Sequence, residues 1–204
     1  LQNYTNSTSN AYVSGGNLVI QARKEQSGSN DYTSARLITK GKKTFQFGRI
    51  DVRAKIPKGK GVWPAIWMLG ADIDQNNWPK CGEIDIMELR GSKPKELIST
   101  MHYATSAGTH RYEGETKVLP IDLSTDFHIY SVVRSDKMTR FYLDGNPQPY
   151  YTYNGTSASP YPFNNAFFLI LNVAVGGHFD GNPDGSATFP QQMQVDYVRY
   201  YQYK

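Results

Sequence analysis

The most regular signal in the chain is an alternation of apolar and polar residues with a period of two. In Gly48–Ile56 (GRIDVRAKI), Ile50, Val52 and Ala54 fall on one face and charged residues on the other. Such alternation predicts a β-strand with one buried face and one solvated face. Runs of similar length predict further strands at Asn17–Ala22, Tyr32–Thr39, Glu83–Leu89, Glu96–His102, Phe127–Arg134, Thr139–Leu143 and Gln194–Tyr201.

One segment differs, because Ala166–Val175 (AFFLILNVAV) is apolar on both faces apart from Asn172. This pattern predicts a central strand that is covered on both sides. No segment has a helical apolar stripe with caps, and turn signals such as Asp144-Gly145 separate the short strands. The pattern therefore predicts an all-β fold, a sandwich or barrel of antiparallel sheets, in one domain spanning residues 1–204.

Charge and composition exclude several classes of protein. The 204 residues carry a net charge of +4, and the charges are dispersed apart from Lys40–Lys43, which we interpret as a hairpin loop. A nucleic-acid-binding face needs a larger basic patch, so we expect no nucleic-acid partner. No apolar run approaches the roughly 20 residues of a membrane span, so we expect no membrane partner either. A single cysteine excludes an internal disulfide framework.

Three acidic residues stand close together in Cys81–Gly91, which reads CGEIDIMELRG. In a regular strand Glu83 and Asp85 share one face, whereas Glu88 falls on the opposite face. A buried unpaired carboxylate on that face would be costly. One extra residue, a β-bulge at Ile86-Met87, reverses the alternation and places all three acids on one face. Bulges of this kind are enriched beside active sites, where they redirect a side chain.

Neighbouring carboxyl groups with no interleaved basic residue repel one another, so stability alone rarely selects them. Glycoside hydrolysis needs such a set, with one carboxylate to attack the anomeric carbon and one carboxylic acid to protonate the leaving oxygen. The middle acid, Asp85, can hydrogen-bond its neighbours and separate their pKa values. From these residues alone, the alternative is an acidic strand that faces solvent and chelates a cation.

All three tryptophans of the chain, Trp63, Trp67 and Trp78, stand close to the acidic segment in the sequence. Flat aromatic rings with a polar edge bind the apolar faces of sugars well. Trp63 and Trp78 stand beside prolines in expected loops, which makes them the better candidates for a substrate cleft. Trp67 lies among apolar residues, so the pattern leaves core and cleft equally open for it.

With these residues in place, the chain closely resembles glycoside hydrolase family 16, in its laminarinase-like branch. The resemblance implies a β-jelly-roll sandwich of two antiparallel sheets (concanavalin A-like) whose concave sheet forms an open cleft. It implies Glu83 as nucleophile, Asp85 as its assisting acid and Glu88 as general acid/base. The acidic motif with its extra residue Met87 resembles that of laminarinases, whereas the lichenase branch has the shorter motif E-I-D-I-E. The matching segments run in family order over nearly the whole chain: YTSARLITKGKKTFQFGRIDVRAKIPKGKGVWPAIWMLG, WPKCGEIDIMELRG, STMHY, FHIYSVVRSDKMTRFYLDG, FFLILNVAVGG and QVDYVRYYQ.

The same resemblance implies a set of substrate-binding residues. Two of them keep a structural alternative, His102 as a hydrogen-bonding residue of a strand and Asn172 as a satisfied core amide. Phe179 stands where the family commonly has a tryptophan, which weakens that sugar platform. The full set is Trp63, Trp67, Trp78, His102, Asn172, Arg36, Asn10 and Phe179.

No cofactor is expected for catalysis, but the resemblance implies a structural calcium ion. Asp196 matches its carboxylate ligand and Gly16 a backbone-carbonyl ligand, oxygen donors that suit a hard cation. Family members usually carry an N-terminal segment before the point where this chain opens with LQNYT. We expect that this segment is absent from the domain and can be supplied by another piece of the protein.

These features predict a retaining endo-β-1,3-glucanase that hydrolyses β-1,3- or mixed β-1,3/1,4-glucans as a secreted, extracellular monomer. Two alternatives stay open. One is a family-16 galactanase of the agarase or carrageenase type, whose sulfated substrates would favour a more basic cleft. The other is a non-catalytic β-glucan-binding domain, a class in which the acids are typically replaced.

Overall fold

The computed structural model describes residues 1–155 and 157–203, and its strands form two β-sheets packed against each other. The larger sheet has nine strands in the order β1-β4-β3-β15-β6-β11-β12-β13, with β2 paired to β3. Its pairs are antiparallel except for the parallel pair of β1 with β4. The strand bounds are Gln2–Tyr4 (β1), Ala11–Ser14 (β2), Asn17–Ser27 (β3), Asn30–Ser34 (β4), Gly48–Lys55 (β6), His128–Ser135 (β11), Met138–Leu143 (β12), Tyr151–Tyr153 (β13) and Gln191–Tyr201 (β15).

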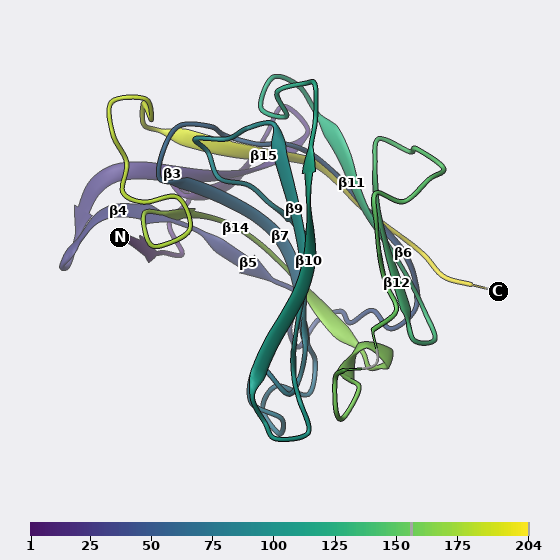
Figure 1. The fold of residues 1–204 in the computed structure, drawn as a ribbon. Helices are drawn as coiled ribbons and strands as arrows, with labels where there is room; N and C mark the ends of the chain where they lie inside the picture. The colour runs from purple at the N-terminus through teal and green to yellow at the C-terminus, as the bar shows by residue number, and fades with distance from the viewer. Residues whose placement is uncertain (156, 204) are drawn as a thin grey trace.

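The smaller sheet has six antiparallel strands in the order β10-β9-β8-β7-β14-β5. Figure 1 shows β9 and β10 as a long twisted hairpin at its edge, with β6, β11 and β12 in the layer beside it. A short 3-10 helix, Pro162–Asn164, precedes β14, and no helix of the described residues is long and apolar enough to span a membrane. The strand bounds are Arg36–Ile38 (β5), Val62–Gly70 (β7), Glu83–Glu88 (β8), Glu96–Ala104 (β9), His110–Val118 (β10) and Phe167–Val175 (β14).

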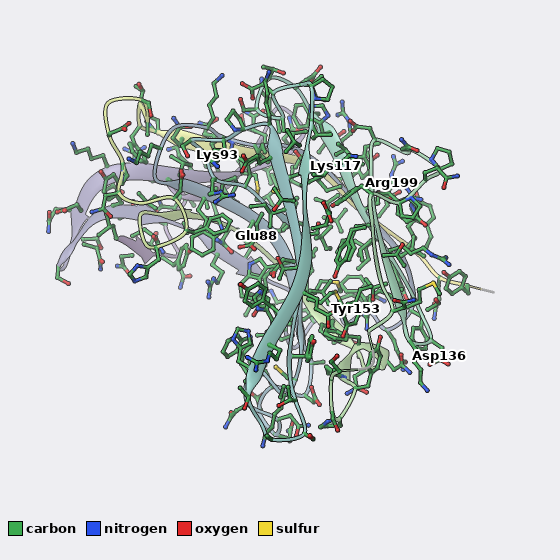
Figure 2. All side chains as sticks on the ribbon, viewed as in Figure 1. Glu88, Lys93, Lys117, Asp136, Tyr153 and Arg199 are labelled. Carbon is green, nitrogen blue, oxygen red and sulfur yellow. The ribbon has the colours of Figure 1, made fainter. Side chains whose placement is uncertain are left out.

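A continuous apolar core fills the space between the two sheets. Alternation along each strand sends every second side chain into this core, and each large apolar side chain buried there contributes about 1.5–3 kcal/mol. Tyr153 lies in the core between the sheets, whereas Glu88 lies on the opposite side of β9 and β10 (Figure 2). The predicted all-β jelly-roll sandwich is confirmed, with the outer face of the six-stranded sheet left for a substrate.

Two predicted assignments need correction, one of a strand and one of a loop. Tyr32–Thr39 is not one strand, because β4 ends at Ser34 in the larger sheet and β5 begins at Arg36 in the smaller one. Buried Ala35 is the residue at which the chain crosses between the sheets. The region of Trp63 is not a loop, since β7 runs through it from Val62 to Gly70.

Candidate active site

The acidic strand β8 carries the predicted bulge. Its pairing with β7 aligns Trp67 with Asp85 but Ile66 with Met87, so that one additional residue of β8 lies between these pairs. The pairing with β9 shifts over the same stretch, between Asp85 and Glu88. Ile86 and Met87 are both fully buried, and the bulge thereby returns Glu88 to the face that carries Glu83 and Asp85.

A pocket of about 260 Å³ opens on this face of the six-stranded sheet. The three acids of β8 form part of its lining, together with residues from β1, β5, β7 and β14. Arg36 is the basic residue of the lining, so the pocket has an excess of acidic groups. Its residues are Gln2, Tyr4, Arg36, Trp63, Ala65, Trp67, Glu83, Asp85, Glu88, Asn172 and Ala174.

Burial separates the protonation behaviour of the three acids. Burial and the neighbouring Asp85 raise the pKa of Glu88 to about 8, against the opposing effect of a hydrogen bond from Trp63. The pKa of Asp85, whose residue is only 3% exposed, rises well above its ordinary value through burial and the charge of Glu83. The pKa of Glu83 also rises, chiefly through burial, while His102 lowers it. Glu88 therefore holds its proton at neutral pH, and Glu83, the less deeply buried partner of Asp85, is the acid best placed to be ionised.

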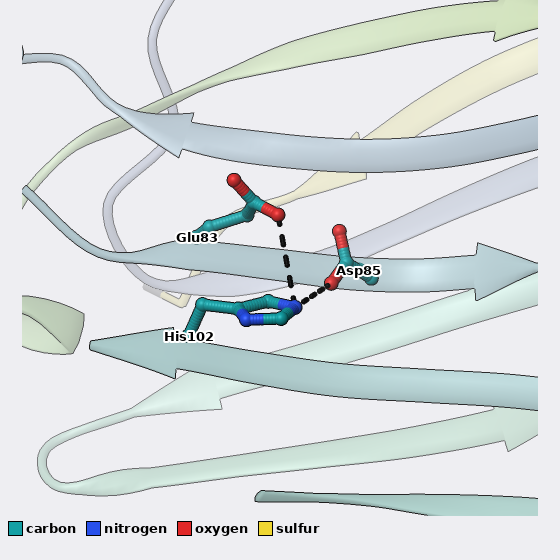
Figure 3. A group of neighbouring side chains, drawn as sticks. All are labelled: Glu83, Asp85 and His102. Atoms are coloured by element: carbon teal, nitrogen blue, oxygen red, sulfur yellow. Dashed lines mark ion pairs between the residues drawn. The ribbon is translucent and has the colours of Figure 1, made fainter. Parts of the chain in front are cut away.

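His102 lies beside Glu83 and Asp85, on the neighbouring strand β9. The register places His102 opposite Glu83, and its Nε2 atom is 3.1 Å from Asp85 Oδ2 and 3.8 Å from Glu83 Oε1 (Figure 3). One nitrogen or oxygen atom of each of the three residues lies within 4.8 Å of the others, and among these contacts the His102–Asp85 distance of 3.1 Å is within hydrogen-bond range. The structure thus places His102 next to the acids, and its role toward substrate stays a prediction.

Two indole groups of β7 lie beside the acids, on the side of β8 that pairs with β7. Trp63 Nε1 donates a hydrogen bond of 2.9 Å to Glu88 Oε1, and the Trp63 ring stacks on Phe179 with centroids 4.5 Å apart. Trp67 Nε1 donates a hydrogen bond of 2.7 Å to Asn172 Oδ1, and Arg36 lies over the Trp67 ring at 5.2 Å. Both tryptophans and Asn172 therefore line the pocket, which decides the open case of Trp67 in favour of the cleft.

The structure does not bring Asn10 to the pocket, contrary to the prediction. Asn10 is 0% exposed, and its Nδ2 atom donates to the Gln21 carbonyl and to Thr33 Oγ1 at 3.0 Å each. Its Oδ1 atom accepts a hydrogen bond from Thr5 Oγ1. The amide is thus fully used in holding β3 and β4 to the N-terminal segment, and no substrate can reach it.

Several residues at the site were missed by the sequence prediction. Tyr4 accepts a hydrogen bond of 3.2 Å from Asn172 Nδ2, and Arg36 lies over its ring at 5.0 Å. On the other side of the acids, His110 lies between the exposed rings of Trp78 and Tyr112, with centroids at 4.5 and 6.1 Å. Aromatic residues in polar segments were the available signal, but no apolar pattern placed them on a strand.

The residues predicted to bind calcium lie at the larger sheet. Val195 pairs with Leu18, which brings Asp196 beside the turn that contains Gly16. Asp196 Oδ2 accepts a hydrogen bond of 2.7 Å from Arg53 Nη1, and within the described residues no further acidic or histidine ligands gather around it. A calcium ion prefers about six to eight oxygen ligands, so this paired carboxylate does not by itself fit one. The calcium site stays a prediction.

Carboxyl groups of unequal pKa on an open sugar-accessible face define a class of protein, the glycoside hydrolases. The sequence profile described as "Glycosyl hydrolases family 16" matches residues 2–199. The chain therefore belongs to glycosyl hydrolase family 16.

Individual relatives agree with this assignment. A glucan endo-1,3-beta-glucosidase A1 of Niallia circulans is 40% identical over 98% of this chain and 32% of that protein. A beta-glucanase of Rhodothermus marinus is 40% identical over 100% of this chain and 74% of that protein. The crystal structure of the laminarinase catalytic domain from Thermotoga maritima has a TM-score of 0.90 and 44% identity, over 100% of this chain and 84% of that chain. The chain thus spans about a third of the Niallia protein and most of the other two.

Proposed function

We propose that this chain is the catalytic domain of a retaining endo-β-1,3-glucanase that cleaves β-1,3- or mixed β-1,3/1,4-glucans. The observation that carries the proposal is the bulged strand β8, which places Glu83, Asp85 and Glu88 on one face with unequal pKa values. Retaining glycosidases need one ionised and one protonated carboxyl group on either side of the glycosidic bond.

The first step uses Glu88 as an acid and Glu83 as a nucleophile. Glu88, whose pKa is about 8, keeps its proton at neutral pH and donates it to the glycosidic oxygen, so that the leaving sugar departs neutral. Glu83 attacks the anomeric carbon from the opposite side and forms a covalent glycosyl-enzyme. Asp85 is more deeply buried than Glu83 and therefore holds the proton of that pair, which leaves Glu83 ionised.

The second step reverses the role of Glu88. Its carboxylate now takes a proton from water, the water attacks the anomeric carbon, and the bond to Glu83 breaks. Two inversions give a product with the original configuration. The Trp63 indole, which donates to Glu88, stabilises the carboxylate form needed in this step.

Two observations support a β-1,3-glucan over other polysaccharides. The acidic motif with its extra residue Met87 resembles that of laminarinases, and two of the relatives named above are a glucan endo-1,3-beta-glucosidase and a laminarinase catalytic domain. Arg36 is the single base of the pocket lining, whereas sulfated galactans of the carrageenan type would favour a more basic cleft.

Glu83→Gln tests the proposal directly. The wild-type chain is expected to release reducing sugar from laminarin, more slowly from lichenan, and not from agarose or κ-carrageenan. Because Gln cannot act as a nucleophile, Glu83→Gln should lose at least about a thousandfold in kcat on laminarin. An unchanged melting temperature would show that the variant is folded, and undiminished hydrolysis by it would refute the assignment.

A non-catalytic glucan-binding domain is the second candidate function. All three acids are present on one accessible face here, which is the observation against it. In that case laminarin would bind to the wild type and to Glu83→Gln with similar affinity, and neither protein would release product.

A further inference from the structure

His110, on the edge strand β10, lies beside the histidine that faces the carboxyl groups. Tyr112 pairs with His102 and His110 with Ala104, so the side chains of His102, His110 and Tyr112 share the cleft face. The two imidazole planes are only 19° apart, with ring centroids separated by 5.2 Å and His102 Nδ1 2.9 Å from His110 Nε2. A nitrogen separation so much shorter than the centroid separation describes two nearly coplanar rings joined edge to edge by a hydrogen bond.

This hydrogen bond determines which nitrogen of His102 carries the proton. His102 Nε2 faces Asp85 Oδ2 and Glu83 Oε1 at 3.1 and 3.8 Å. Glu83 Oε1 is beyond hydrogen-bond range, whereas Asp85 Oδ2 is a buried oxygen left without a hydrogen-bond partner among the described residues, so a proton on His102 Nε2 is the one placed to satisfy it. Its Nδ1 atom is then an acceptor, and His110 Nε2 must be the donor.

The surroundings of His110 suit a neutral donor. Burial is the largest cause that lowers the pKa of His110. Trp78 packs on it from the loop before β8, and Tyr112 lies beside it on its own strand. Both of these rings are uncharged at neutral pH. His110 therefore carries one ring proton, and the hydrogen bond to His102 uses it.

We propose that His110 is a positioning residue that holds His102 in the tautomer whose Nε2 proton points at Glu83 and Asp85. This arrangement turns a polar N–H toward Glu83 at 3.8 Å, and its electrostatic attraction favours the ionised form of that carboxylate. In the serine-protease triad, a group behind the histidine sets the tautomer in the same way, and its loss lowers kcat through the wrong tautomer. The proposal rests on the glucanase reaction proposed above.

Replacing His110 by Ala and by Gln separates positioning from a general structural role. In His110→Ala, kcat on laminarin should fall about tenfold, the equivalent of one hydrogen bond, while KM stays within about twofold. The acidic limb of the kcat/KM profile should move to higher pH, because Glu83 loses the ordered His102 N–H whose electrostatic attraction favours its ionised form. In His110→Gln, the amide N–H replaces the donor and should restore most of kcat. Lys117→Ala, an exposed change on the same strand, should alter neither quantity.

The ring nitrogens of His102 provide a readout that does not depend on hydrolysis. Nitrogen-15 NMR should show the Nε2–H tautomer dominating in the wild type and a mixture of tautomers in His110→Ala. A wild type that fails to cleave laminarin would refute the proposed function, whereas the tautomer populations would still decide the histidine pair. The pairing idea is overturned by an Nδ1–H tautomer in the wild type, or by unchanged kcat and acidic limb in His110→Ala. If the Ala variant does not fold, His110→Gln and the wild-type spectrum decide.

Discussion

Glu88 holds its proton at neutral pH because its carboxyl group is buried beside Asp85, while Trp63 donates a hydrogen bond to its Oε1 atom. A general acid works best when its pKa lies near the working pH, since it must give up the proton in one step and take one back in the next. Burial and the indole act in opposite directions, so their balance sets the alkaline limit of activity.

Trp63→Phe should move that alkaline limit upward. Phe keeps an aromatic ring to stack on Phe179 but removes the N–H that lowers the pKa of Glu88. Since Glu88 acts in its protonated form, the alkaline limb of kcat/KM, near pH 8 in the wild type, should shift to higher pH. Trp67→Phe is the matched control, because its indole bonds Asn172 and not an acid. A limb that stays in place or falls in Trp63→Phe would contradict the role of this hydrogen bond.

The raised pKa of Glu88 also has a consequence for stability. Its pKa of about 8 in the folded protein exceeds the ordinary value of 4.5, so the folded state binds the proton more tightly than the unfolded chain. The contribution of Glu88 to stability is therefore fully present below pH 4.5 and is lost as the pH rises through about 8.

Glu88→Gln removes the charge that is unfavourable at high pH. We compare the melting temperature of the variant minus that of the wild type at two pH values. This difference should be larger at pH 9 than at pH 5 by at least roughly 2–4 °C, which corresponds to about 1 kcal/mol for a chain of this size. Activity should fall sharply at the same time, because Gln has no proton to donate. Calorimetry at the two pH values measures the difference, and an equal gap at both would show that Glu88 titrates normally in the fold.

At the scale of secondary structure, the bulge in β8 connects core packing to catalysis. Ile86 and Met87 occupy successive positions and are both 0% exposed, so the core holds both side chains of the bulge. The same two residues set the direction of Glu88. Packing behind the sheet therefore fixes the position of the acid in front of it.

Met87→Ala should reduce both stability and turnover. Removing a buried Met side chain costs about 2–5 kcal/mol, and a cavity under the bulge lets Glu88 move. A misplacement near 1 Å can cost up to about a hundredfold in rate, so kcat on laminarin should fall at least about tenfold. Met193→Ala, equally buried but in the larger sheet, should lose similar stability in urea denaturation and keep its kcat. Equal kcat losses in the two variants would mean that the bulge has no special role.

The sequence predicted some elements well for reasons that can be stated physically. The bulge was predictable because leaving Glu88 on the buried face carries a known cost. The break at Ala35 was not, since residues 32–39 contain no glycine or proline to mark the point at which the chain changes sheets. The edge strand β10 is almost entirely exposed, so it has no apolar face to reveal it. His110 was missed with it.

Within the site, prediction was best where the chemistry of a residue restricts its surroundings. The three acids and His102 belong together because their charges interact. Asn10 was misplaced because an amide satisfies its hydrogen bonds equally well in a core or in a cleft, and the sequence does not distinguish the two. Tyr4 is far from the acids in the sequence and reaches Asn172 only through the fold.

At the scale of the whole molecule, β8 lies inside the six-stranded sheet, and residues suited to sugar contact lie on both sides of it. Toward β5 the pocket is lined by Trp67, Arg36 and Tyr4. Toward β10 the rings of Trp78 and Tyr112 are 44% and 67% exposed, enough to meet a ligand. A glucan that crosses the sheet can therefore contact the protein on both sides of the bond that is cleaved.

This arrangement predicts internal cleavage, because a chain that binds on both sides of the acids does not need its end in the site. On a long, soluble β-1,3-glucan, viscosity should fall by half when only a small fraction of bonds has been broken, and early products should be a mixture of oligosaccharides. Chromatography of the first products against released reducing ends measures both. Trp78→Ala should lower the rate on polymers more than on short oligosaccharides, since the exposed Trp78 ring beside His110 is available to sugars beyond the reacting one. A single short product from the earliest times, with viscosity falling in proportion to bonds broken, would show that the enzyme works from chain ends and that one side of the sheet is closed to the glucan.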